Sequence, residues 1–115
     1  VSLHYHLSSE TENSFNAHDF AIMNKGAFFL NTERAELVDE EAMLESLSNG
    51  HLKGAAVDVI TYEYMYDKWN HPVVKFSREH DNLVLSPHVA GLTIESERKS
   101  ANDIIDQLID YFENK

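Results

Sequence analysis

Three residues with distinct chemistry each follow a short apolar segment of the chain: Arg34, Glu63 and His88. The guanidinium group of arginine is planar, permanently charged and able to bind a carboxylate through two hydrogen bonds. Histidine takes up and releases a proton near neutral pH, and a nearby carboxylate favours its protonated form. These residue types are typical of a site that binds a small anion and transfers a proton. Taken singly, they also fit a solvated arginine and a structural histidine at a strand end.

The segments around these residues predict alternating strands and helices. Continuous apolar runs such as Ala27–Leu30 are typical of strands buried on both faces of a parallel sheet. Asn16 and Asp39 are typical helix N-caps, and Gly50 is expected to end the second helix. The stretch from Thr61 to Asp81 is expected to be irregular. The expected strands are Val1–Leu3, Ala27–Leu30, Ala55–Val57 and Asn82–Leu85, and the expected helices are Ala17–Met23, one between Asp39 and Gly50, and one after Thr93 with an apolar stripe of Ala101, Ile104, Ile105, Leu108 and Phe112.

This order of elements predicts an α/β fold with roughly four mainly parallel strands and flanking helices. In such sheets, ligands bind just beyond the carboxyl ends of the strands. Here these ends carry Tyr5-His6, Thr32-Glu33-Arg34, the segment from Asp58 to Glu63, and His88. We therefore expect a cation, two carboxylates and an imidazole to gather along one rim of the sheet.

Composition and charge exclude several classes of partner and site. The 115 residues include 20 acidic and 9 basic side chains, which give a net charge of −11, and 43% of the residues are hydrophobic. This charge disfavours nucleic acid and anionic membrane surfaces, and no apolar run is long enough to span a membrane. The absence of cysteine excludes disulfides, thiolate metal sites and a cysteine nucleophile, and it favours a cytoplasmic location.

A zinc site is the weakest of the functional hypotheses. His4 and His6 fall on one face of the first expected strand and could chelate zinc. Seven histidines make such spacing common by chance, and no third ligand is evident. We therefore expect no metal site.

Three longer motifs occur in one order and at one spacing. The segment MNKGAFFLNTERAELVD at residues 23–39 is followed by GHLKGAAVDV at residues 50–59, with Glu63 soon after it, and then by SPHVAG at residues 86–91. Together they resemble the signatures of the D-isomer-specific 2-hydroxyacid dehydrogenases, the family of phosphoglycerate dehydrogenase. The resemblance covers nearly the whole chain. It implies a Rossmann-type fold and hydride transfer between NAD and a small 2-hydroxy or 2-keto acid.

The resemblance also implies a role for each matching residue. Arg34 would hold the carboxylate and carbonyl oxygens of the substrate. His88 would be the general acid or base, and Glu63 would hold His88 and favour its protonated form. Asp58 would hold the nicotinamide carboxamide, although it could instead cap the turn that follows its strand. The implied contacts to NAD or NADP come from Thr32, Glu33, Arg34, Asp58, His88, Val89, Ala90 and Gly91.

The sequence departs from the family pattern in several places. Ala35 stands where the family motif has glycine, Tyr64 stands where proline follows the acid, and His4-Tyr5-His6 replaces a His-x-Pro motif. The loop G-x-G-x-x-G, which holds the cofactor pyrophosphate, does not occur among the four glycines. The resemblance therefore implies a partial Rossmann-type fold, a single domain over residues 1–115 without this loop and without the substrate domain. We expect weak or absent NAD binding and no turnover by this chain alone.

Two functional hypotheses therefore stand beside the metal-binding one. The first is the second half of the NAD-binding domain of an NAD-dependent D-2-hydroxyacid dehydrogenase. The second is a non-enzymatic module that self-associates or pairs with a partner chain. In the family fold Val1–Leu3 would lie in mid-sheet, and its open edge here predicts a homodimer.

Overall fold

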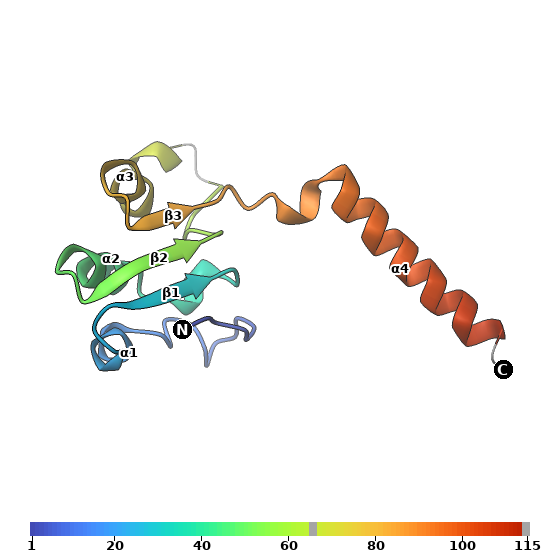
Figure 1. Ribbon diagram of the computed structural model, residues 1–115, viewed down its shortest axis with the longest axis horizontal. Helices are drawn as coiled ribbons and strands as arrows, with labels where there is room; N and C mark the ends of the chain where they lie inside the picture. Colours follow the sequence, from blue (N-terminus) through green and yellow to red (C-terminus); the bar gives the residue numbers. More distant parts are fainter. Residues whose placement is uncertain (65–66, 114–115) are drawn as a thin grey trace.

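The computed structural model describes residues 1–64 and 67–113, in which strands alternate with helices (Figure 1). This alternation confirms the predicted α/β class. The elements in chain order are α1 (Ala17–Ile22), β1 (Ala27–Asn31), the 3-10 helix η1 (Ala35–Leu37), α2 (Glu40–Ser48), β2 (Leu52–Val57), η2 (Lys68–Asn70), α3 (Pro72–Glu79), β3 (Leu83–Leu85), η3 (Ala90–Leu92) and α4 (Ile94–Glu113).

Within the described residues, the sheet has three parallel strands in the order β1-β2-β3. Of the four strands expected from the sequence, Val1–Leu3 is the one that does not form. It makes only an isolated parallel bridge between Ser2 and Leu30. The Leu3 amide donates to the Leu30 carbonyl at 3.2 Å, and the Leu30 amide donates to the Val1 carbonyl at 2.9 Å. The expectation of roughly four strands was therefore wrong by one, because a single residue of this segment pairs with β1.

The two N-caps predicted from the sequence start the first two α-helices. The Asn16 side chain accepts a hydrogen bond from the His18 amide at 2.9 Å, and the Asp39 carboxylate accepts one from the Ala42 amide at 3.0 Å. These contacts satisfy amide groups that the first turn of a helix leaves unpaired. Gly50 follows α2 with a φ of +72°, a conformation that glycine adopts without strain.

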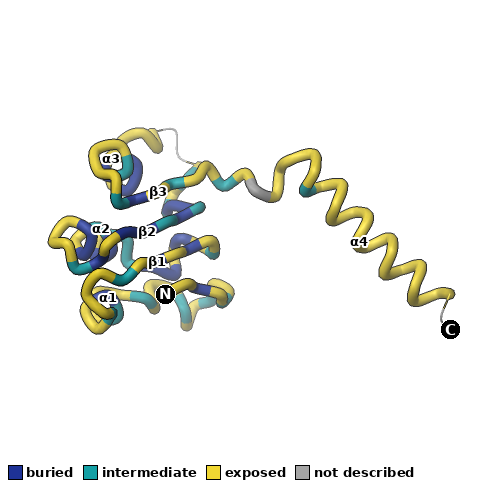
Figure 2. The backbone as a smooth tube through the Cα atoms, in the orientation of Figure 1, coloured by how far each residue is buried: buried dark blue, intermediate teal, exposed yellow. Residues whose placement is uncertain are grey.

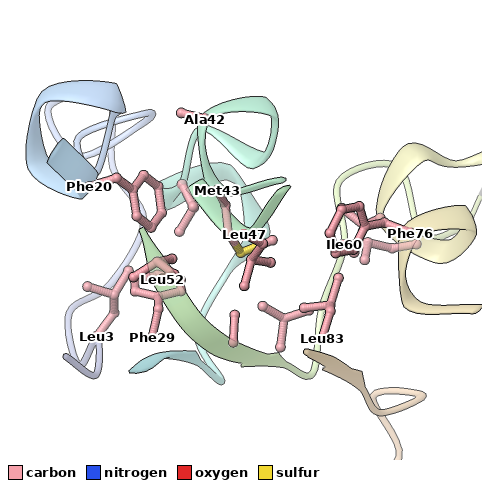
Figure 3. Packing of buried hydrophobic residues seen from close by; sticks show 14 of the residues in the cluster. Leu3, Phe20, Phe29, Ala42, Met43, Leu47, Leu52, Ile60, Phe76 and Leu83 are labelled. Atoms are coloured by element: carbon pink, nitrogen blue, oxygen red, sulfur yellow. The ribbon is translucent and has the colours of Figure 1, made fainter. Parts of the chain in front are cut away.

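The hydrophobic core lies between one face of the sheet and the helices α1, α2 and α3 (Figures 2 and 3). Phe29 of β1 and Phe20 of α1 are fully buried, and their ring centroids lie 5.1 Å apart. The Phe15 ring packs against both, at 4.9 Å from Phe20 and 5.1 Å from Phe29. Met43 of α2 and Val73 of α3 extend the same cluster along the sheet. This packing fixes the carboxyl ends of the three strands relative to one another.

The opposite face of the sheet is open. Phe28 and Leu30 of β1 are 54% and 42% exposed, and Val84 of β3 is 63% exposed. Burial therefore alternates along β1, and the expectation that Ala27–Leu30 is buried on both faces was wrong. The physical reason is that α1, α2 and α3 all pack on the other face (Figure 3).

Helix α3 lies inside the stretch that was expected to be irregular. It begins at Pro72, whose fixed backbone angle suits the first turn of a helix. His71 is its N-cap and accepts a hydrogen bond from the Val73 amide at 3.3 Å. The helix buries Val73, Val74 and Phe76 against the sheet.

Helix α4 occupies the predicted position after Thr93 but projects away from the body of the protein (Figure 1). Its apolar stripe is therefore exposed, with Ile104 at 59%, Leu108 at 52% and Phe112 at 72% exposure. None of the helices within residues 1–64 and 67–113 combines the length and the apolar character that crossing a membrane requires.

Candidate active site

The residues with predicted chemistry follow the carboxyl ends of the three strands. Arg34 lies shortly after β1, Asp58 directly after β2, and His88 shortly after β3. Because the strands are parallel, their carboxyl ends meet at the same rim of the sheet. Glu63 reaches this rim on the segment between β2 and α3.

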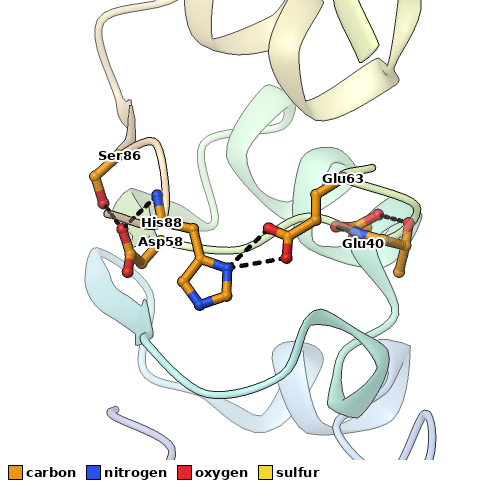
Figure 4. A network of polar contacts seen from close by, with 6 residues as sticks. Glu40, Asp58, Glu63, Ser86 and His88 are labelled. Atoms are coloured by element: carbon orange, nitrogen blue, oxygen red, sulfur yellow. Dashed lines mark hydrogen bonds and ion pairs between the residues drawn. The ribbon is translucent and has the colours of Figure 1, made fainter. Parts of the chain in front are cut away.

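His88 and Glu63 are in direct contact at this rim (Figure 4). The Nδ1 atom of His88 lies 2.9 Å from Oε1 and 3.0 Å from Oε2 of Glu63. A carboxylate can only accept hydrogen bonds, so His88 donates through a proton on Nδ1. This leaves Nε2 as the atom that can take up a proton from a ligand or release one to it. The contact that the family resemblance implied between these two residues is present.

Asp58 holds the turn that carries His88. Its Oδ1 atom accepts hydrogen bonds from the Ser86 hydroxyl and from the His88 amide, the latter at 3.2 Å (Figure 4). His88 has a φ of +52°, and this left-handed conformation costs a residue other than glycine about 1–3 kcal/mol. The two hydrogen bonds offset this strain. Asp58 therefore fixes the position of the histidine from the neighbouring strand.

Arg34 projects from a turn that Asn31 stabilises. The Asn31 side chain is buried, and its carbonyl accepts a hydrogen bond from the Glu33 amide at 3.0 Å while its amide donates to the Arg34 carbonyl at 3.2 Å. Thr32 and Arg34 are exposed at the rim. Ala35, which departs from the family motif, begins η1, where φ is negative and an alanine side chain causes no strain.

A cavity of about 450 Å³ opens beside the histidine, in the size range of pockets for small organic ligands. His88 and Glu63 line it together with the apolar side chains of Ile60, Val74 and Leu85. Lys68 of η2 adds a positive charge to the lining. The arrangement can therefore hold a small apolar or anionic group next to the histidine ring.

The remaining predicted cofactor contacts lie just beyond His88. Val89 is 45% exposed, Gly91 is exposed, and Ala90 begins η3. His4 and His6, the alternative metal ligands, are exposed near the N-terminus. Across residues 1–64 and 67–113 there is no group of three or more histidine, cysteine, aspartate or glutamate side chains that could hold a metal ion.

The pKa of the Tyr64 phenol depends on the charged groups of this site. A hydrogen bond to Glu63, and then the charge of that carboxylate, raises the pKa of Tyr64 above its usual value of 10.0, while the positive charge of Arg34 opposes the shift. Arg34 therefore lies within electrostatic range of the segment that carries Glu63. The contact stabilises the fold below pH 10, and this contribution is lost as the pH rises through the raised pKa of Tyr64.

We predict that Glu63→Gln lowers the pH at which Tyr64 titrates, because the amide removes the negative charge beside the phenol. An alkaline titration followed by phenolate absorbance measures this, and the difference spectrum against Tyr64→Phe isolates the one tyrosine. Glu10→Gln, a remote acidic position, serves as the control. Identical Tyr64 titrations in the wild-type and Glu63→Gln chains would show that the two side chains do not interact.

Several residues around the site were not predicted from the sequence. Asn31 had a readable signal, because asparagine before polar residues at a strand end is typical of a turn in which the side chain bonds the backbone. Thr61 and His71 bind Glu40 across gaps of 21 and 31 positions, a contact for which the sequence carries no local signal. Lys68 lies in the stretch that was expected to be irregular.

Comparison with known sequences relates this site to one enzyme family. The sequence profile described as "D-isomer specific 2-hydroxyacid dehydrogenase, NAD binding domain" matches residues 1–90. A glyoxylate reductase of Thermofilum pendens is 41% identical over 101 residues, which cover 88% of this chain and 28% of that protein. A D-3-phosphoglycerate dehydrogenase of Escherichia coli is 33% identical over 116 residues, which cover 99% of this chain and 27% of that protein. The chain thus spans about a quarter of the length of these relatives.

Solved structures give the same relation. The NAD-complexed D-isomer specific 2-hydroxyacid dehydrogenase of Lactobacillus delbrueckii ssp. bulgaricus matches with a TM-score of 0.78 at 32% identity, over 94% of this chain and 35% of that one. The D-lactate dehydrogenase of Lactobacillus jensenii with NAD+ matches with a TM-score of 0.76 at 32% identity, over 84% of this chain and 31% of that one. These likenesses confirm the predicted Rossmann-type α/β fold.

Proposed function

Because the chain belongs to the D-isomer-specific 2-hydroxyacid dehydrogenase family, within its NAD-binding domain, we propose that it carries the proton-transfer and substrate-anchoring residues of such an enzyme. The substrate class is a small 2-hydroxy or 2-keto acid, and the location is cytoplasmic. The observation that carries this proposal is the contact between His88 and Glu63 beside the cavity. In this proposal residues 1–115 correspond to the second half of the NAD-binding domain, and we expect no turnover from these residues alone.

Each residue of the rim has a defined task in this proposal. Glu63 keeps a proton on Nδ1 of His88, so Nε2 accepts the hydroxyl proton of a 2-hydroxy acid and returns it in the reverse direction. Arg34 binds the substrate carboxylate through its planar guanidinium group. Asp58 keeps the His88 turn in its left-handed conformation, and apolar side chains line the cavity beside the ring.

The residues present fit one end of the cofactor. NAD, when bound, would supply the hydride acceptor or donor. Thr32 and Asp58 lie at the rim, where polar groups and a carboxylate suit a carboxamide. The pyrophosphate, by contrast, needs the G-x-G-x-x-G loop, which this sequence does not contain.

We predict that NAD binds this chain with a dissociation constant on the order of millimolar or weaker. The reason is that residues 1–115 offer contacts to the nicotinamide end but contain no G-x-G-x-x-G loop for the pyrophosphate. Calorimetric titration measures the affinity, and Asp58→Asn serves as a comparison because it removes a charge at the rim. Micromolar binding by the wild-type chain would contradict the prediction.

A chimera tests the proposed function directly. The segment of the Escherichia coli D-3-phosphoglycerate dehydrogenase that matches this chain is replaced by residues 1–115. The remainder of that enzyme supplies the pyrophosphate-binding loop and the substrate domain. We expect NADH-dependent reduction of 2-keto acids by the chimera. A chimera that melts cooperatively and binds NADH, yet turns over no faster than its His88→Asn variant, would refute the proposal.

An exposed sheet face and an open sheet edge support a second candidate function, that of a self-associating module. The sheet exposes Phe28, Leu30 and Val84 on one face, and the segment Val1–Leu3 forms its outer edge. Val1 and Leu3 bond to Leu30 of β1, so the backbone groups of Ser2 between them face away from the sheet. Such an edge is a template for a second copy, and a two-fold axis would join two sheets antiparallel.

We predict that Ser2→Pro shifts a homodimer towards the monomer, because proline lacks the amide that would pair across the edge. Ser2→Ala keeps this amide and is the matched control. Leu3→Pro is a poorer test, since the Leu3 amide already donates to Leu30 within the chain. Size exclusion with light scattering measures the state. A wild-type monomer at micromolar concentration, or a dimer that Ser2→Pro leaves intact, would exclude edge pairing.

A further inference from the structure

The segment that presents Glu63 to His88 has an unusual backbone. Tyr62, which directly precedes Glu63, has a φ of +55°, a left-handed conformation that side chains other than glycine rarely adopt. The Tyr62 side chain is 73% exposed, so its own packing does not account for this conformation. A strained residue of this kind persists where the residues on both sides of it are held in place.

Glu63 is held on one side of Tyr62 by His88, and Thr61 is held on the other side by Glu40. The Thr61 amide donates to Oε1 of Glu40 at 3.0 Å, and the Thr61 hydroxyl donates to Oε2 at 2.6 Å. Glu40 is the first residue of α2, which packs against the sheet. One carboxylate therefore accepts hydrogen bonds from both donor groups of Thr61 and joins the segment to a rigid element.

His71 completes this contact from the other end of the segment. Its Nδ1 atom accepts a hydrogen bond from the Val73 amide at 3.3 Å, so its proton lies on Nε2. That Nε2 atom is 3.2 Å from the Thr61 hydroxyl and 3.5 Å from Oε2 of Glu40. The two ends of the segment between β2 and α3 thus meet at the Glu40 carboxylate.

We propose that Glu40, Thr61 and His71 are positioning residues that set the place of Glu63 and thereby the orientation of the His88 ring. They touch neither the ring nor the cavity and act through the backbone at Tyr62. The inference rests on the proposed function, because it assigns these residues to the alignment of the proton-transferring pair. Asp58, directly after β2, accepts a hydrogen bond from the His88 amide and holds that residue in a similar manner. A carboxylate therefore fixes the backbone near each member of the His88–Glu63 pair.

The proton on Nδ1 of His88 provides a direct readout in the nitrogen-15-labelled chain. In the wild type it is bonded to Glu63 and should exchange slowly with water, and His88→Asn assigns the signal by removing it. We expect Thr61→Val to accelerate the exchange by about tenfold or more, since it deletes a hydrogen bond to a charged group. Thr61→Ser, the conservative control, retains the hydroxyl, and we expect the ring proton to exchange as slowly as in the wild type. A role confined to folding would change the melting temperature without this selective effect on the ring.

Glu40→Gln and Glu41→Gln form a matched pair in the first turn of α2. Both remove one charge near the helix N-terminus, but only Glu40 binds Thr61. We expect faster exchange of the His88 ring proton in Glu40→Gln and no change in Glu41→Gln. A ring proton that stays slow in both Thr61→Val and Glu40→Gln overturns the positioning role alone. A wild-type chain without a slowly exchanging ring proton overturns the contact with Glu63, and with it the proposed function.

Discussion

We expect His88→Asn to lower kcat for 2-keto acid reduction by about 10²–10⁴-fold in the phosphoglycerate dehydrogenase chimera, the contribution typical of a positioned general acid or base. Nε2 of His88 is the atom that would move the proton, and asparagine has no group that titrates near neutral pH. Asparagine also adopts the left-handed conformation more readily than alanine, so the backbone at φ +52° is preserved. Steady-state kinetics with NADH measure the effect.

His80→Asn is the control for this experiment. His80 is the C-cap that follows α3 and stacks on Phe76, with ring centroids 4.0 Å apart, and it does not line the cavity. We expect this variant to keep kcat within about twofold, because a surface substitution has a small effect. A His88→Asn chimera that retains most of its turnover would show that another group transfers the proton, and the assignment of His88 would fail.

Local signals predicted much of this fold from the sequence. Asn16 and Asp39 cap the helices that they were expected to cap, because an N-cap depends on amides within three positions. The place of His88 just after the expected strand Asn82–Leu85 predicted that this residue lies at the rim. Its partner Glu63 could be assigned only through the family resemblance, since the two positions are 25 residues apart.

The features that sequence reasoning missed depend on contacts between distant segments. Helix α3 begins at Pro72 without a Ser, Thr, Asp or Asn cap, so the usual start signal was absent. Phe28 is as apolar as Phe29, and which of them is buried depends on the face that the helices cover. Whether Leu108 in the apolar stripe of α4 is buried likewise depends on which segments pack against that helix, and here it is exposed. The bond between Glu40 and Thr61 leaves no pattern in the sequence.

We expect Phe29→Ala to lower the free energy of unfolding by about 3–5 kcal/mol, the usual cost of deleting a buried aromatic ring. Phe29 is fully buried, and its ring packs against Phe15 and Phe20. Because small domains are stable by about 5–15 kcal/mol in total, the variant should lose a large part of its stability. Urea denaturation measures the change.

The neighbouring variant Phe28→Ala separates the buried face of β1 from the open one. The Phe28 ring is 54% exposed, lies against Gly54, and has the Lys53 ammonium 5.7 Å from its centroid. Its removal should cost less than about 1 kcal/mol in a monomer. An equally large loss in both variants would contradict an open sheet face. If the cost of Phe28→Ala grows with protein concentration, a second copy of the chain covers that face, because only association makes stability depend on concentration.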